Sequence, residues 1–322
     1  MIFRKAISLS FLFIVLFSFS SCKKPTQTVN PTRVIVIDKG MAIYDLLTIN
    51  DSTILAVGGQ RNVNGKIFLS EDGGQTWLKT WESPFCIYTV YERKDSVIFA
   101  GGDSITLLKS VDNGKSWQSI INYPFSNWQS FVTPIQSICF INSDTGFVVG
   151  GDNQNKGIYG FTGDGGMDWK FRNFNNEFHS VIFDTNKIGY IVGYGKVLRT
   201  NNNGVDWQEE KFSGENLKSA IIQNQVVWVC GYRGNIYSNE AGQWHPVFDV
   251  SAWNNQIHWC DIINTKNNNL LAVGNNGLLW LNRSGTIMEL ADAPDLLSIT
   301  EAGSNVFYVG TNDGRIYVFS LY

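Results

Sequence analysis

The residues that most suggest chemistry form a short acidic motif that recurs along the chain. Residues 70–77 read SEDGGQTW, and residues 110–117, 162–169 and 200–207 read SVDNGKSW, TGDGGMDW and TNNNGVDW. A shorter copy, SNEAGQW, occupies residues 238–244. A catalytic centre would occur once in the chain. A motif that repeats while its acidic residue is gradually replaced is instead typical of a structural turn.

The residue types in this motif are those that stabilise a tight turn. An Asp side chain can accept hydrogen bonds from the N–H groups of its own turn, and glycine permits a positive φ. The Ser or Thr hydroxyl adds a local hydrogen bond, and the Trp can pack against the sheet. We therefore expect a structural role for the following residues of the five copies: Ser70, Asp72, Gly74, Trp77, Ser110, Asp112, Gly114, Trp117, Asp164, Gly166, Trp169, Gly204, Trp207, Gly242 and Trp244.

Other groups that could do chemistry do not form a recognisable site. Glycoside hydrolysis usually needs two facing carboxylates, and nothing in the sequence pairs Asp45 with Asp261. His179 and His258 could share a ligand, but no third metal ligand is evident, so we predict neither a metal nor a cofactor. The four internal cysteines have no CxxC spacing; buried free thiols are favoured, and a disulfide stays open. They are Cys86, Cys139, Cys230 and Cys260.

The composition is that of an ordinary globular protein. Of the 322 residues 43% are hydrophobic and 16% are charged, and the formal net charge is −3, which gives no electrostatic reason to expect a nucleic-acid partner. Glycine (31 residues) and aromatic residues (14%) are frequent, whereas only 7 prolines occur. This balance favours many short strands joined by glycine turns.

The acidic turn belongs to a longer repeat of about 40 residues, which predicts a propeller or a solenoid. Seven apolar runs end in glycine, namely ILAVGG, VIFAGG, GFVVGG, GYIVG, VWVCG, LLAVG and VFYVG. Each unit reads as four short strands without helical periodicity, which is one propeller blade. The last unit is one strand short, and a spare apolar strand, TRVIVID, occupies residues 32–38. We therefore predict an all-β, seven-bladed propeller of four-stranded antiparallel blades, closed by the N-terminal strand in the last blade.

The N-terminus has the features of a targeting segment. Residues 1–21 contain Arg4 and Lys5 followed by an apolar stretch too short to span a bilayer comfortably, and the run SFSSC ends at Cys22. This run resembles the lipobox of bacterial lipoproteins, which implies that Cys22 is lipidated; a plain secretory signal is the alternative. We expect residues 22–32 to be a flexible tether and residues 33–322 the propeller. The implied location is the outer membrane, on its periplasmic side, with contact to the membrane through the lipid only.

The repeats resemble two known groups of sequences. The turns are similar to the Asp-box, or bacterial neuraminidase repeat, whose S-x-D-x-G-x-T-W consensus residues 70–77 match at every defined position. The whole unit is similar to that of the photosystem II stability and assembly factor family. That resemblance covers residues 33–322 and implies a seven-bladed propeller that acts as an assembly scaffold. The arginine motif of sialidases is not found, so an enzyme is not expected; if the chain were one, it would be a glycoside hydrolase.

We expect a ligand or partner to bind on the face where the innermost strands begin, because loops converge there around the channel. Aligning those strands gives a column of candidate binding residues, flanked by loop residues Trp128, Trp253 and Arg233. The column consists of Tyr44, Tyr88, Gln136, His179, Lys218 and His258, with Leu297 in the seventh unit. The next column is mostly small or polar and consists of Asp45, Thr89, Ser137, Ser180, Ser219, Trp259 and Ser298. Three functions stay open: a non-enzymatic scaffold for an envelope protein, which we favour, a glycan-binding lipoprotein, and a divergent sialidase-like hydrolase. We expect a monomer.

Overall fold

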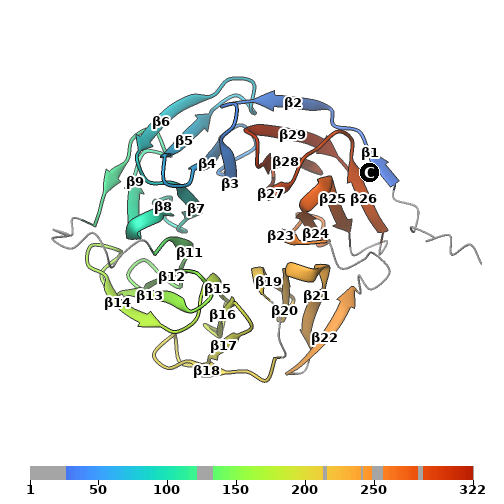
Figure 1. Ribbon diagram of the computed structural model, residues 1–322. Coiled ribbons are helices and arrows are strands. Elements are labelled where there is room, and N and C mark those ends of the chain that lie inside the picture. The colour runs from blue at the N-terminus through green and yellow to red at the C-terminus, as the bar shows by residue number, and fades with distance from the viewer. Residues whose placement is uncertain are drawn as a thin grey trace, which may run out of the picture.

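The chain forms a ring of seven small sheets around a central channel (Figure 1). The computed structural model describes residues 27–121, 133–212, 216–240, 242–248, 257–281 and 286–321. Each sheet is a blade whose strands follow one another from the channel outward, and consecutive strands pair antiparallel. The predicted seven-bladed propeller of four-stranded antiparallel blades is confirmed. None of the helices in the described residues is long and apolar enough to cross a membrane.

The first four blades use consecutive strands from β3 to β18. Blade one contains β3 (Ala42–Thr48), β4 (Ile54–Gln60), β5 (Asn64–Ser70) and β6 (Leu78–Ser83). Blade two contains β7 (Ile87–Glu92), β8 (Ile98–Gly102), β9 (Thr106–Ser110) and β10 (Gln118–Ser119). Blade three contains β11 (Ile135–Phe140), β12 (Gly146–Asp152), β13 (Lys156–Thr162) and β14 (Lys170–Phe174). Blade four contains β15 (Phe178–Phe183), β16 (Gly189–Gly193), β17 (Val197–Thr200) and β18 (Gln208–Glu209).

The last three blades include both N-terminal strands. Blade five contains β19 (Leu217–Gln223), β20 (Val226–Gly231), β21 (Ile236–Glu240) and β22 (Gln243–Phe248). Blade six contains β23 (Trp259–Asn264), β24 (Leu270–Gly274), β25 (Leu278–Leu281), β26 (Thr286–Leu290) and the added β1 (Gln27–Val29). Blade seven contains β27 (Leu296–Glu301), β28 (Val306–Thr311), β29 (Arg315–Ser320) and β2 (Arg33–Val36). Short 3-10 turns follow the second strands of blades two, five and six: η1 (Asp103–Ile105), η2 (Tyr232–Gly234) and η4 (Asn275–Gly277).

The N-terminal strand closes the ring as its sequence predicts. β2 pairs antiparallel with β29 over Arg33–Val36 and supplies the missing outer strand of blade seven. The Arg33 guanidinium also donates a hydrogen bond of 2.6 Å to the carbonyl of Gly73, in blade one. This strand therefore joins the last blade to the first and removes an open sheet edge.

One part of the expected tether is instead ordered. Gln27–Val29 form β1, which pairs in parallel with the outer strand β26 of blade six, and the Ala291 N–H donates to the Val29 carbonyl at 2.9 Å. Because β26 would otherwise be an outer edge, its unpaired backbone groups attract any extended segment nearby. The flexible tether predicted for residues 22–32 therefore does not extend through Gln27–Val29.

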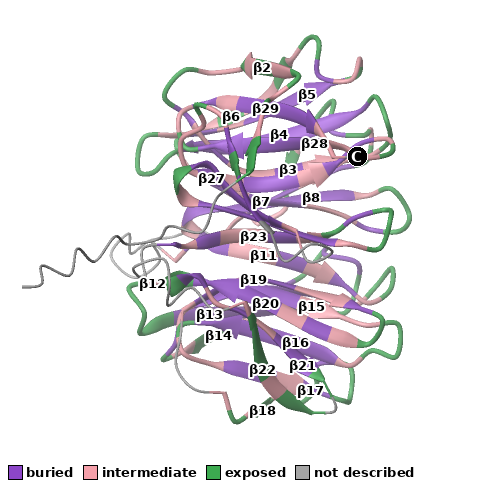
Figure 2. Cartoon of the chain, turned by 90° about the vertical axis from the view of Figure 1, so that its right-hand side faces the viewer, coloured by how far each residue is buried: buried purple, intermediate pink, exposed green. Residues whose placement is uncertain are grey.

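The hydrophobic core is divided into seven clusters, one at each interface between neighbouring blades. Between blades one and two, for example, Leu55 and Ile67 pack against Ile87 and Leu108, and all four side chains are buried. Full burial of such a side chain contributes roughly 1.5–3 kcal/mol relative to exposure. Figure 2 shows the buried strands in the body of the ring and the exposed loops on its two faces.

The repeated glycine at the end of each second strand has a steric cause. A Cβ on Gly150 would lie 1.8 Å from the carbonyl oxygen of Pro134, and one on Gly193 would lie 2.0 Å from that of Glu177. In both blades the carbonyl belongs to the residue just before the innermost strand. The glycine therefore lets the backbone that leads into the innermost strand pass close to its neighbour.

Candidate binding site at the channel mouth

Each innermost strand contains a β-bulge at its second or third residue, next to the channel mouth. In blade one the bulge lies between Ile43 and Asp45, so Tyr44 is the extra residue. A bulge re-aims the side chain of its extra residue, here toward the channel. The seven extra residues are Tyr44, Tyr88, Gln136, His179, Lys218, Cys260 and Leu297.

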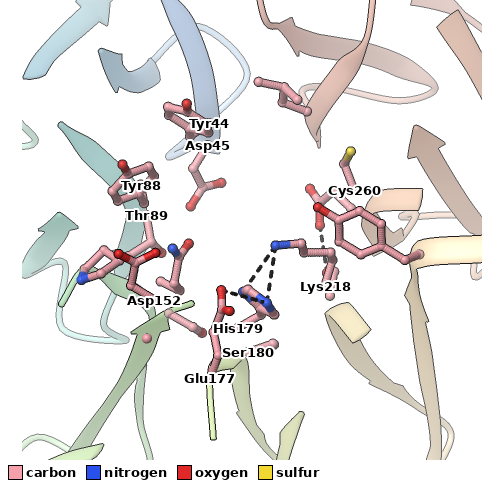
Figure 3. Close-up of a pocket in the computed structure, with 18 of the residues that line it drawn as sticks. Tyr44, Asp45, Tyr88, Thr89, Asp152, Glu177, His179, Ser180, Lys218 and Cys260 are labelled. Carbon is pink, nitrogen blue, oxygen red and sulfur yellow. Dashed lines mark hydrogen bonds and ion pairs between the residues drawn. The ribbon is translucent and has the colours of Figure 1, made fainter. Parts of the chain in front are cut away.

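All seven of these residues line a cavity of about 600 Å³ at the channel mouth (Figure 3). The structure thus brings together six of the seven residues that the sequence placed in one column. The exception is His258. In blade six the aligned position belongs to Cys260, and the next position belongs to Asp261 rather than to Trp259, which is fully buried between blades.

His258 lies instead in the loop contact between blades five and six. Its ring is 4.7 Å from the ring of Tyr232, its Nδ1 accepts a hydrogen bond of 3.2 Å from the Arg233 N–H, and its own N–H donates to Asn275 at 2.8 Å. Arg233 is exposed on η2 and does not line the cavity. Trp128 and Trp253 lie outside the described residues.

The floor of the cavity is a second ring of polar side chains, one residue further along each innermost strand. Its members that line the cavity are Asp45, Thr89, Ser137, Ser180, Ser219 and Asp261. Five of these, all but Thr89, also line a second cavity of about 790 Å³ deeper in the channel. The polar ring is therefore the waist of the channel.

The two carboxylates of the waist connect neighbouring blades through backbone groups. Asp45 accepts hydrogen bonds of 2.8 Å from the N–H of Leu46 and from that of Val90, in the next blade. Asp261 accepts bonds from the N–H of Ile262 (2.8 Å) and Ile299 (3.1 Å) and from the Ser219 hydroxyl (2.9 Å).

Burial in the channel works against the charge of both carboxylates. Burial and the charge of Asp261 raise the pKa of Asp45 from its ordinary 3.8 to about 7, although the backbone N–H groups of Val90 and Leu46 oppose the shift. Burial likewise raises the pKa of Asp261. Two desolvated carboxylates therefore share the waist, and their hydrogen-bond partners among the described residues are neutral N–H and O–H groups.

A basic group lies across the cavity from Asp45, as Figure 3 shows. The Lys218 ammonium lies 3.3 Å from Nε2 of His179 and 5.3 Å from the centre of the Tyr232 ring. Glu177 lies 3.3 Å from the same histidine nitrogen. Burial and the charge of Lys218 hold the pKa of His179 well below 6.5, so this histidine is neutral near pH 7. Burial also lowers the pKa of Lys218.

The opposite wall is aromatic and is backed by charged groups. The rings of Tyr44 and Tyr88 are 4.8 Å apart, and Arg61 forms an ion pair of 2.8 Å with Asp152 nearby. Asp103 lies behind this wall, only 3% exposed, and neither of its carboxylate oxygens has a hydrogen-bond partner within 3.5 Å. The Tyr88 hydroxyl and Arg61 favour its charged form from a longer range, but burial outweighs them and raises the pKa of Asp103.

Several of these residues were missed by sequence reasoning. Arg61 and Glu177 lie in loops with no repeat pattern to mark them, and Cys260 was displaced by the misaligned sixth unit. The available signal was the second column, where Asp45 replaces the small hydroxyl residues of other blades, as Asp261 does once the sixth unit is realigned. No group of three or more His, Cys, Asp or Glu side chains with metal-binding geometry occurs in the described ranges. The four cysteines are free thiols, and Cys86 and Cys230 are buried.

The acidic turns lie at the opposite ends of the blades. In the first, Asp72 accepts hydrogen bonds from the N–H groups of Gln75 (2.9 Å) and Thr76 (2.9 Å) and from the Thr76 hydroxyl (2.6 Å). The buried Ser70 hydroxyl donates to Asp72 at 2.8 Å and accepts from the Gly74 N–H at 2.8 Å. Trp77 donates to the Gly74 carbonyl and packs into the cluster between blades seven and one.

The other turns repeat this arrangement with graded losses. Ser110 with Asp112 and Thr162 with Asp164 form the same hydroxyl-to-carboxylate bond at 2.8 Å, and Gly114 and Gly166 donate to the respective hydroxyls. In the fourth turn Asn202 replaces Asp and still accepts from Thr200 and from the Asp206 N–H. The tryptophans Trp117, Trp169, Trp207 and Trp244 each pack against an interblade cluster, and Gly204 and Gly242 have positive φ. Every hydrogen bond named here is internal to its turn. Each turn is therefore suited to holding together the two strands that it connects.

Fold and cavity together define a seven-bladed β-propeller with an open, polar channel mouth. Solved structures share this fold. The structure described as YCF48 bound to D1 peptide superposes with a TM-score of 0.69 and 16% identity, over 92% of this chain and 99% of the other. YCF48 from Cyanidioschyzon merolae gives 0.64 and 16%, over 89% and 98%, and the WD40 propeller domain of Doa1 gives 0.65 and 12%, over 92% and 98%. No protein-family model and no curated protein matches the sequence.

Proposed function

We propose that this propeller is a non-enzymatic binding scaffold whose channel-mouth cavity holds a segment of a partner protein. The cavity is the observation that supports the proposal: it combines aromatic rings, amide and hydroxyl groups, and both charge signs around a space of about 600 Å³. A space of that volume accommodates a few side chains of an extended segment, and convergent polar groups among aromatic rings are typical of binding pockets. The similar fold of YCF48 is known with a peptide bound.

The waist carboxylates favour binding over hydrolysis. Asp45 and Asp261 each accept bonds from backbone N–H groups of two blades, which fixes both in the channel floor, whereas the carboxylic acid and the carboxylate of a glycosidase flank the scissile bond. A glycan ligand would use the same aromatic wall, and the crosslinking experiment described next distinguishes a glycan from a protein partner.

Photo-crosslinking in cells tests the proposal. A benzophenone amino acid in place of Tyr88, in the cavity wall, should capture a specific protein, and the same group in place of the exposed Val205, on the acidic-turn face, should not. Capture from Val205 alone, or capture of glycan without protein from Tyr88, would contradict the proposal. The crosslinked peptide also identifies the partner segment.

We also propose that the propeller is anchored to the outer membrane by lipid on Cys22, on the periplasmic side. The support is the SFSSC run after a short apolar stretch. Cys22→Ala should move the protein from the membrane fraction to the soluble fraction, since a lipid chain is the only contact that we expect with the membrane. Unchanged membrane association of the variant would remove this part of the proposal.

A further inference from the structure

The charges around the channel-mouth cavity do not balance. Four carboxylates line it, those of Asp45, Asp152, Glu177 and Asp261, against the two cations of Arg61 and Lys218. Arg61 forms an ion pair with Asp152, and Lys218 and Glu177 both lie against His179, which is neutral. The uncompensated charge therefore belongs to the two waist carboxylates, Asp45 and Asp261.

The uncompensated carboxylates are placed where a ligand could reach them. Both line the cavity, and Figure 3 shows the Asp45 carboxylate pointing into it beside Tyr44. Their hydrogen bonds come from N–H and O–H groups that carry no net charge. Both Asp45 oxygens and Oδ2 of Asp261 accept one bond each and keep a lone pair for another donor, whereas Oδ1 of Asp261 already accepts two. The charge of Asp261 acts directly against that of Asp45, and an added cation would relieve the repulsion.

A third carboxylate adds to the negative potential of the same side. Asp103 lies 97% buried behind the aromatic wall with both oxygens unpartnered, and its charge acts on Tyr44, on Tyr88 and on Arg61. Arg61 is exposed and already paired with Asp152 at 2.8 Å, so it compensates this carboxylate only from a distance. Burial favours the neutral form of such a carboxylate, and an approaching positive charge favours the ionised form.

The aromatic wall suits a cation that is carried on an aliphatic stem. Tyr44 and Tyr88 present two rings, 4.8 Å apart and tilted by 59°, at the edge of the acidic side. Tyrosine rings attract ammonium and guanidinium groups and also pack against the methylene stem of lysine or arginine. The opposite wall shows the same pairing within the chain, since the Lys218 ammonium lies over the Tyr232 ring.

From this arrangement we propose that the cavity recognises a basic side chain, Lys or Arg, of the partner segment, with its stem along Tyr44 and Tyr88 and its charge at Asp45 and Asp261. This inference rests on the proposed function and adds the chemistry of the partner. It commits the acidic half of the cavity to a cation and leaves Lys218 with its existing contacts to His179 and Tyr232.

Peptide display on the immobilised full chain provides the test. Linear peptides are selected on the wild-type protein, and those that no longer bind Tyr88→Ala are kept as cavity-directed. Each is then resynthesised with every Lys replaced by norleucine and every Arg by citrulline, which keep the shape and remove the charge. We expect the cavity-directed peptides to carry a basic residue whose replacement weakens binding about tenfold or more.

Variants of the protein locate the contact. Asp45→Asn and Asp261→Asn should each weaken the basic peptide but have little further effect on its norleucine or citrulline form. The Asp144→Asn variant, on the opposite face, should bind every peptide as the wild type does. If an Asn variant fails to fold, because these carboxylates also accept backbone N–H groups, the peptide substitutions on the wild-type protein decide the question alone.

Three outcomes would overturn the inference. Cavity-directed peptides that bind equally well without a basic residue would refute it and leave the proposed function standing. Binding that is abolished by a chelator and restored by Ca²⁺ would show that the carboxylates hold a metal ion instead. A selection that yields no peptide dependent on Tyr88 would reject both this inference and the proposed function.

Discussion

At the scale of single residues, the Ser or Thr hydroxyl contributes more to each acidic turn than the sequence motif alone suggests. Ser70 is 1% exposed and connects the Asp72 carboxylate to the Gly74 N–H. The motif predicts that these residues form a turn, but only their burial indicates which of them contributes most to stability. Asp72 lies at the surface, whereas Ser70 satisfies a buried N–H that has no other partner within the turn.

Replacing this hydroxyl should destabilise the propeller. Ser70→Ala leaves the Gly74 N–H buried without an acceptor, which costs about 1–3 kcal/mol in the free energy of unfolding. Urea unfolding measures the loss. Val111→Ala, at a side chain 74% exposed in the neighbouring turn, is the matched control and should change the free energy of unfolding very little. Equal stabilities of Ser70→Ala and the wild type would show that the turn does not need the hydroxyl.

Asp45 should make the stability depend on pH. Its pKa is about 7 in the folded protein against an ordinary 3.8, so the unfolded chain ionises first as the pH rises. The stability that Asp45 contributes is therefore complete below about pH 4 and is lost toward pH 7, by at most about 1.4 kcal/mol per pH unit.

The comparison of Asp45→Asn with the wild type isolates this contribution. Between about pH 4 and pH 7 the free energy of unfolding should fall less for the variant than for the wild type, because the titrating group is absent. Asp144→Asn, at an exposed carboxylate, should retain the wild-type slope. Parallel pH profiles for Asp45→Asn and the wild type would contradict the raised pKa.

At the scale of elements, the sequence predicts pairing better than register. The spare strand at residues 32–38 is recognisable because one blade lacks an outer strand, and β2 fills that position. The bulge in each innermost strand is not visible in a pattern of apolar residues. The sixth unit reads IHWCD, in which either His258 or Cys260 can be aligned with the column of the other blades. The buried Trp259 selects the alignment that places Cys260 at the bulge. The error for His258 follows from that ambiguity.

The two N-terminal strands should contribute differently to stability. Removing residues up to 26 keeps both strands and should leave the thermal transition unchanged. Removing residues up to 31 deletes β1 and should lower the melting temperature modestly, because β26 loses a parallel neighbour. Removing residues up to 38 also deletes β2 and exposes β29 as an apolar edge, so aggregation or loss of the cooperative transition should follow.

This truncation series separates closure from simple chain shortening. Thermal unfolding and light scattering are measured on all three forms. A form lacking β2 that melts as cooperatively as the form lacking only β1 would show that the ring does not require the N-terminal strand.

At the scale of the whole molecule, the acidic turns and the channel-mouth cavity lie on opposite faces of the propeller. Acidic turns and tryptophans hold the far ends of the blades, and the bulges gather seven side chains at the channel mouth. The sequence locates that face because the innermost strands can be aligned. It does not show the waist, because Asp45 and Asp261 lie five blades apart along the chain and come close only when the ring closes.

The affinity of a partner segment for the two faces tests the central claim most directly. With the segment identified by crosslinking made as a peptide, binding is measured by calorimetry to the wild type, to Tyr88→Ala and to Val205→Ala. We predict that Tyr88→Ala weakens binding by about 1–3 kcal/mol and that Val205→Ala leaves it unchanged. Undiminished binding to a folded Tyr88→Ala, together with loss of binding to Val205→Ala, would place the site on the acidic-turn face and contradict the account.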